Sequence, residues 1–101
     1  MVSGELEVDL DFRQAKLRGQ ALNLSQHYVK VLIYLMQHPH EDIHLSKILD
    51  QVWPQSEEPS ENQVRMAIYY IREALQDYDE FLKTVRGEGR YRWVKDVTSE
   101  E

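Results

Sequence analysis

Basic side chains gather near the carboxyl end of the sequence, where their spacing suits a phosphate backbone. Between residues 83 and 95 one acid, Glu88, accompanies five basic residues: Lys83, Arg86, Arg90, Arg92 and Lys95. Arg65 and Arg72 lie in the segment before them. Lys and Arg are the side chains that neutralise nucleic-acid phosphates. This part of the chain is therefore the first candidate for chemistry.

The overall charge has the opposite sign. The 101 residues carry a formal net charge of −6, which is unfavourable for a nucleic-acid ligand. Much of the acid lies near the amino terminus, in Glu5, Glu7, Asp9 and Asp11. Because the charge is segregated along the chain, the negative total understates the positive potential near the carboxyl end.

Other chemistries lack the residues that they need. The absence of cysteine excludes disulfides, thiolate nucleophiles and Cys-type zinc sites. The glycines at 87 and 89 precede no expected helix, so they do not form a phosphate-binding loop. The first five residues lack the basic and apolar blocks of a signal peptide, so none is expected, and no apolar run has the length needed to span a membrane. We expect no enzyme, no cofactor and no membrane contact by this segment, and a cytoplasmic location.

The stretch HPHEDIH, residues 38–44, is the one candidate metal site. Imidazoles and carboxylates can bind zinc. However, Pro39 fixes a turn, and His40 and His44 are the only pair at helical i, i+4 spacing with a supporting Glu base, Glu41. An inter-helix loop explains the segment more simply, and no metal is expected.

The elements that must position the basic residues follow from periodicity. Apolar and polar residues alternate over 5–24, which predicts two or three antiparallel strands. Helical stripes predict three helices: one from a Ser25 cap to about His38, a second over 45–52, and a third to about Asp77. Ser60 and Gln63 form a capping-box pattern at the start of the third.

A hairpin over 82–94 is expected around the glycines, followed by a frayed polar tail, 95–101. The fold class is α+β in a single domain, 1–101, with strands over 1–24 and a three-helix core over 25–77.

Several of these motifs, in this order, resemble the effector domain of OmpR/PhoB-type (ToxR/CadC-like) regulators. LNLSQHYVKVLIYLMQHP is similar to their strand and first helix, and LSKILDQVWP to their second helix. ENQVRMAIYYIREAL is similar to their recognition helix, and KTVRGEGRYRWV to their wing. The resemblance covers about nine-tenths of the chain and implies a winged helix-turn-helix from a bacterial two-component system.

The resemblance implies sequence-specific binding of double-stranded DNA, with the third helix in the major groove. It also implies pairing of two copies on DNA, and RNA polymerase or a sensor or receiver domain as further partners. Together with the basic residues, it gives a candidate DNA-binding set: Trp53, Asn62, Gln63, Arg65, Tyr69, Tyr70, Arg72, Thr84, Arg86, Arg90 and Arg92.

Departures from the family pattern keep two alternatives open. On a helical wheel, Asn62, Met66, Tyr69 and Glu73 form the outer face of the third helix, flanked by arginines. Tyrosines stand where basic residues are frequent, and His44 stands where a capping Ser is usual. One alternative is a winged helix that binds a protein. The other is a single-strand or RNA binder that stacks bases on tyrosines.

Overall fold

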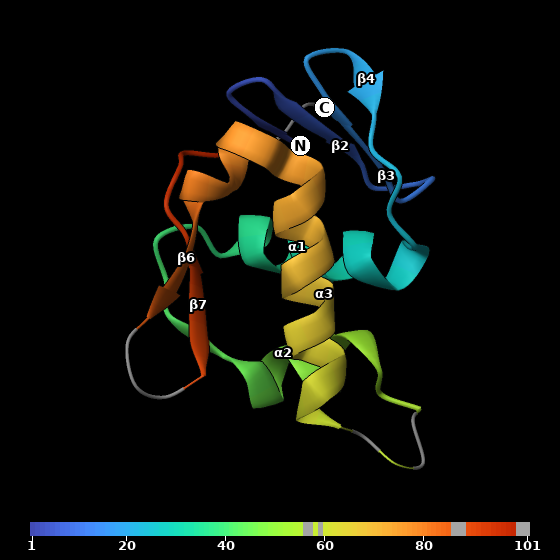
Figure 1. Ribbon diagram of the computed structural model, residues 1–101, viewed down its shortest axis with the longest axis vertical. Helices are drawn as coiled ribbons and strands as arrows, with labels where there is room; N and C mark the ends of the chain where they lie inside the picture. Colours follow the sequence, from blue (N-terminus) through green and yellow to red (C-terminus); the bar gives the residue numbers. More distant parts are fainter. Residues whose placement is uncertain (56–57, 59, 86–88, 99–101) are drawn as a thin grey trace.

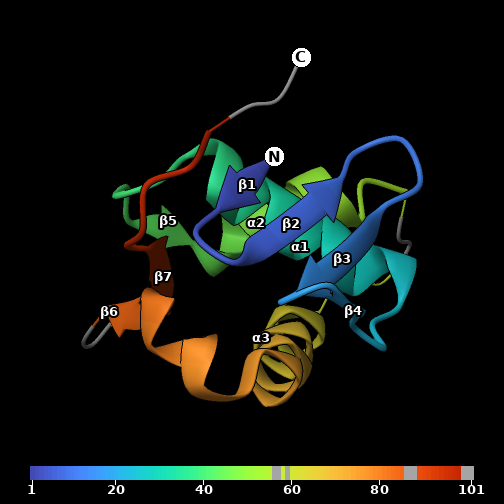
Figure 2. The ribbon, with the colours of Figure 1, turned by 90° about the horizontal axis from the view of Figure 1, so that it is seen from above.

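The structure, a computed structural model, describes residues 1–55, 58, 60–85 and 89–98. An amino-terminal sheet lies across a three-helix core, and a second small sheet lies at the side of that core (Figure 1). Viewed from above, the first sheet lies over the first helix (Figure 2). The α+β prediction, with strands at both ends and three helices between, is confirmed.

The amino-terminal sheet is antiparallel, with strand order β1-β2-β3-β4. Its strands are β1 (Val2–Ser3), β2 (Leu6–Asp9), β3 (Gln14–Leu17) and β4 (Gln20–Ala21). Leu6 pairs with Leu17, and Val8 with Ala15, so the buried positions of β2 and β3 lie opposite one another. The alternation therefore places one apolar face on the helices and leaves the acidic face exposed.

Each of the three helices begins at a capping side chain. Ser25 caps α1 (Gln26–Gln37), and Ser60 with Gln63 forms a capping box at α3 (Glu61–Leu75). The imidazole of His44 caps α2 (Leu45–Val52), because its Nδ1 accepts a hydrogen bond from the Ser46 amide at 3.1 Å. Histidine thus satisfies an amide that a serine would otherwise satisfy.

The third helix is shorter than the sequence indicates. It ends at Leu75, and Gln76 follows with a positive φ of 54°. A 3-10 segment, η1 (Gln76–Phe81), then carries the chain to the second sheet. The prediction of a helix to about Asp77 missed this change. The apolar spacing of the helix continues as far as Tyr78, which is buried, although the α-helical hydrogen bonds end before it.

The second sheet has three strands in the order β5-β7-β6, where a two-stranded hairpin was predicted. These are β5 (Ile43–His44), β6 (Leu82–Val85) and β7 (Arg90–Trp93). We call β6, β7 and the segment between them the wing. Gly89 has a φ of 60°, and its carbonyl accepts a hydrogen bond from the Leu45 amide, so the wing is attached to the start of α2.

Polar contacts join the two ends of the chain at the edge of the core. Trp93 is fully buried, and its Nε1 donates to the Ser3 hydroxyl at 3.0 Å. Ser3 in turn donates to the Asp96 carbonyl. Val2 and Thr98 exchange backbone hydrogen bonds of 2.8 Å. The prediction of a frayed tail is therefore wrong for the residues up to Thr98, because the backbone pairing with Val2 fixes the tail at that point.

Candidate nucleic-acid interface

The outer face of α3 consists of four exposed residues: Asn62, Met66, Tyr69 and Glu73. Their spacing of four, three and four residues places them on one side of a helix, and the apolar stripe, Val64 to Leu75, lies on the other side. We call these four residues the outer ridge. The wheel assignment is confirmed, and none of the four carries a positive charge.

Arg72 lies beside the ridge and forms hydrogen bonds to the wing. Its Nη2 donates to the Leu82 carbonyl at 2.9 Å and to the Thr84 hydroxyl at 2.6 Å. These bonds join α3 to β6, so the helix and the wing are held at a fixed relative position. The structure thus brings together two residues of the candidate set, Arg72 and Thr84, through a bond between them.

Other arginines of the candidate set also have partners within the chain. Arg65 reaches Glu61 one turn earlier on α3, at 3.8 Å. Arg92 donates to Asp42 on the loop before β5, and this contact holds the pKa of the Asp42 carboxyl below its usual range. Arg90 is exposed on β7 and adds to that effect through its charge. Arg86 lies outside the described residues.

Trp53 and the first turn of α3 form a second part of the candidate site. The Trp53 ring stacks on His27 with centroids 5.5 Å apart and an angle of 3° between the planes. A groove of about 450 Å³ lies here and is lined by Ser25, His27, Tyr28, Trp53, Ser60, Asn62, Gln63 and Met66. The first turns of α1 and α3 thus meet beside Trp53.

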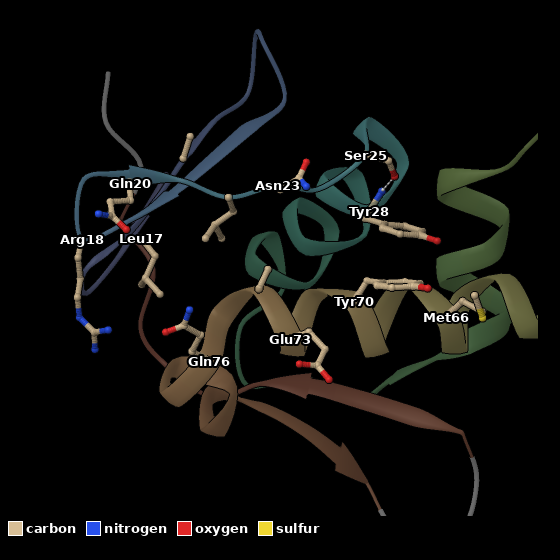
Figure 3. Close-up of a pocket in the computed structure, with 13 residues that line it drawn as sticks. Leu17, Arg18, Gln20, Asn23, Ser25, Tyr28, Met66, Tyr70, Glu73 and Gln76 are labelled. Atoms are coloured by element: carbon tan, nitrogen blue, oxygen red, sulfur yellow. Dashed lines mark hydrogen bonds between the residues drawn. The ribbon is translucent and has the colours of Figure 1, made fainter.

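The two adjacent tyrosines of α3 have different surroundings. Tyr70 stacks on Tyr28 of α1, with ring centroids 5.6 Å apart, and lines a groove of about 750 Å³ between α3 and the segment after β3 (Figure 3). Tyr69 touches Tyr70 edge-on and is 58% exposed. A hydrogen bond with Glu73 raises the pKa of Tyr69. Only Tyr69 therefore belongs to the outer ridge.

Sequence reasoning missed His27 and Tyr28 as parts of this surface. Both precede the main apolar stripe of α1, and Tyr28 could be read only as widening that stripe. Both stack on rings of other elements, Trp53 just after α2 and Tyr70 on α3, and the pattern along α1 contains no sign of those rings. The histidines of the α1–β5 loop have separate partners instead: His38 with Glu41, His40 with Asp96, and His44 at the α2 cap.

Among the described residues, no group of three or more His, Cys, Asp or Glu side chains is arranged to hold a metal ion. In the same part of the chain, no helix has the length and apolar character needed to cross a bilayer.

Comparison with known proteins gives consistent results. The family described as "Transcriptional regulatory protein, C terminal" matches residues 19–93. The two-component response regulator PhoP of Pseudomonas aeruginosa is 29% identical over 89 residues; the match covers 86% of this chain but 40% of PhoP.

Among the solved structures that share the fold are two DNA-binding domains. The DNA-binding domain of E. coli CadC is 27% identical, with a TM-score of 0.78 over 92% of this chain and 89% of that one. The Klebsiella pneumoniae RstA DNA-binding domain in complex with the RstA box is 26% identical, with a TM-score of 0.77 over 93% and 95%. The chain therefore belongs to the C-terminal domain family of OmpR/PhoB-type transcription regulators, which has a winged-helix fold and is not a family of enzymes.

Proposed function

We propose that this chain binds double-stranded DNA sequence-specifically as the effector domain of a bacterial transcription regulator. In this proposal α3 enters the major groove and the wing contacts phosphates. The observation that carries it is the Arg72 contact, which holds α3 and β6 as one unit. The RstA domain bound to its box, at a TM-score of 0.77, supports the same use of the fold.

The proposed contacts divide by chemistry. The outer ridge of α3 spans about 16 Å along the helix, and a major groove of about 12 Å width admits such a helix. Arg65, at the side of α3, and Arg90, on β7 of the wing, are exposed and would reach phosphates. The positive end of the α3 dipole favours an anion near the first turn, where the Asn62 amide itself donates to the Ser60 hydroxyl. Trp53 would pack against the backbone beside that turn.

Fluorescence anisotropy with a labelled random-sequence duplex tests binding itself. At low salt the wild-type chain should bind, and the affinity should fall as salt rises. An Arg65→Ala, Arg90→Ala variant should reduce the slope of log K against log salt by about one for each phosphate that is no longer neutralised. Lys16→Ala removes one positive charge from β3, outside the proposed interface, and is the control. A wild-type chain without duplex affinity at low salt would contradict the proposal.

The wider context of this domain is part of the proposal. Since the chain spans 40% of PhoP, a receiver or sensor domain and RNA polymerase are proposed partners, and the bacterial cytoplasm is the proposed location. Two copies would pair on direct repeats. Sedimentation of the chain with duplexes that carry one or two copies of a selected site would show whether the second copy binds more tightly than the first.

A protein partner is the second candidate function. It is favoured by the exposed side chains of Met66, Tyr69 and Tyr70, which are 42%, 58% and 43% exposed, beside the acidic Glu73. Aromatic residues and Met are enriched in protein interfaces. Failure to bind any duplex, with the fold intact, would favour this function. Competition by single-stranded DNA would instead indicate stacking on the tyrosines.

A further inference from the structure

The arginines of α3 are poorly placed to read bases. Nη2 of Arg72 is held by the Leu82 carbonyl and by Thr84. Arg65 lies to the side of the outer ridge and faces Glu61. A guanine is read mainly by Arg or Lys, which donates two hydrogen bonds to its N7 and O6. The centre of α3 offers no such donor.

The outer ridge offers apolar surface at its middle. Met66 is 42% exposed, and the Tyr69 ring, one turn later, is 58% exposed. The Tyr69 ring packs edge-on against the ring of Tyr70. Tyr70 in turn stacks on Tyr28 (Figure 3). The ridge therefore presents a ring that packing positions, whose ordering costs little on binding, and beside it the adaptable thioether of Met66.

The two ends of the ridge favour different base edges. Asn62 at the first turn can make two hydrogen bonds to adenine N6 and N7. At the other end, Glu73 is an acceptor that would repel the acceptors N7 and O6 of guanine and would accept a hydrogen bond from the N4 amino group of cytosine. Between them, a methyl group at thymine C5 is the feature of the major groove that an apolar surface fits.

We infer that α3 reads thymine methyl groups through Met66 and Tyr69, with adenine favoured at Asn62 and guanine disfavoured along the ridge. This inference rests on the proposed function and defines the class of duplex that the same site selects. Under it, A·T pairs supply the direct readout at Asn62, Met66 and Tyr69, while charge attraction comes from Arg65 and from the wing.

Base analogues in a selected duplex test the inference. A preferred site is first enriched from a random duplex pool. Each thymine is then replaced by deoxyuridine, which lacks only the methyl group, and each guanine by 7-deazaguanine, which lacks N7. We expect one or more thymines at which deoxyuridine weakens binding about threefold to fivefold, the effect of one buried methyl. We expect no guanine beneath α3 at which 7-deazaguanine weakens it.

Protein variants assign the effect to side chains. Met66→Ala and Tyr69→Ala should bind the thymine and uracil duplexes equally at the sensitive position. Phe12→Ala, which removes a 76% exposed ring from the amino-terminal sheet's β2–β3 connection, should keep the discrimination. Circular dichroism confirms the fold of each variant.

Two results would overturn the inference while leaving DNA binding in place. One is an affinity that no deoxyuridine changes. The other is a weakening by 7-deazaguanine that disappears in Arg65→Ala, which would assign guanine readout to that arginine. Absence of any duplex affinity or enrichment would instead overturn the proposed function, and this inference with it.

Discussion

The outer ridge of α3 and the wing lie on neighbouring elements but differ in chemistry. The four residues of the ridge include no cation, and the two in the middle, Met66 and Tyr69, present apolar surface. The described part of the wing carries Lys83, Arg90 and Arg92 on two short strands. If both meet DNA, the salt-dependent part of the affinity belongs to the wing and to Arg65 at the side of α3, and the sequence-dependent part belongs to the outer ridge. A negative net charge is then compatible with DNA binding, because attraction needs only a local group of cations.

The largest expected effect is on the free energy of unfolding, from truncating Trp93, the buried residue at the end of β7. Trp93→Ala deletes a fully buried ring of β7 together with its hydrogen bond to Ser3. Such a truncation costs about 3–5 kcal/mol, a large part of the 5–15 kcal/mol that is typical of a whole domain. Urea unfolding followed by circular dichroism measures the destabilisation. Phe12→Ala, at an exposed position, should change stability by about 0.5 kcal/mol or less; equal effects would show that Trp93 is not part of the core.

Separate variants of the two regions sharpen the comparison on DNA. Arg90→Ala should lower duplex affinity about tenfold at low salt and reduce the salt slope by about one. Met66→Ala should leave the salt slope unchanged and reduce only the preference among sequences. Anisotropy titrations at several salt concentrations distinguish them. The comparison fails if both variants change the slope equally.

The hydrogen bonds that join α3 to the wing can be removed by substituting Arg72. Arg72→Ala removes both hydrogen bonds to β6, and we expect a decrease of about 1–2 kcal/mol in the free energy of unfolding. Thr84→Val removes one of them and should cost about half as much. Arg65→Ala on the same helix, where the described partner is Glu61 rather than the wing, is the control, with about 0.5 kcal/mol or less. Chemical denaturation measures all three, and no difference between Arg72→Ala and Arg65→Ala would contradict the connection.

The smallest effect concerns acid stability at the side of the wing. Because Arg92 lowers the pKa of Asp42 below its ordinary value of 3.8, the pair stabilises the fold above that value. The stabilisation is lost as the pH falls through the lower, folded-state pKa. Asp42→Asn should therefore flatten the dependence of the urea midpoint on pH below about pH 4, by a small amount since both groups are exposed. Glu7→Gln, an exposed carboxylate with no ion pair among the described residues, should not.

Local patterns predicted most of the fold, because they need only neighbours in the chain. The capping box at Ser60 and the apolar stripe of α3 are properties of a few turns. The partners of Arg72 could not be predicted from a wheel, since they lie ten and twelve residues away on another element. The same holds for β5, where two residues pair with β7 only because α2 starts beside the wing. Within the candidate set, the sequence predicted which residues are charged, but it did not predict which of them form hydrogen bonds or ion pairs within the chain.

The pairing of Val2 with Thr98 has a practical consequence. Since backbone hydrogen bonds hold these residues side by side, a short peptide linker could join the two ends without disturbing the sheet. The chain could then be opened elsewhere, as a circular permutant, with new termini at exposed Pro54 and Gln55. Such a protein would carry its helices and wing in a different chain order, and its folding rate would show how far the order of elements matters compared with their contacts.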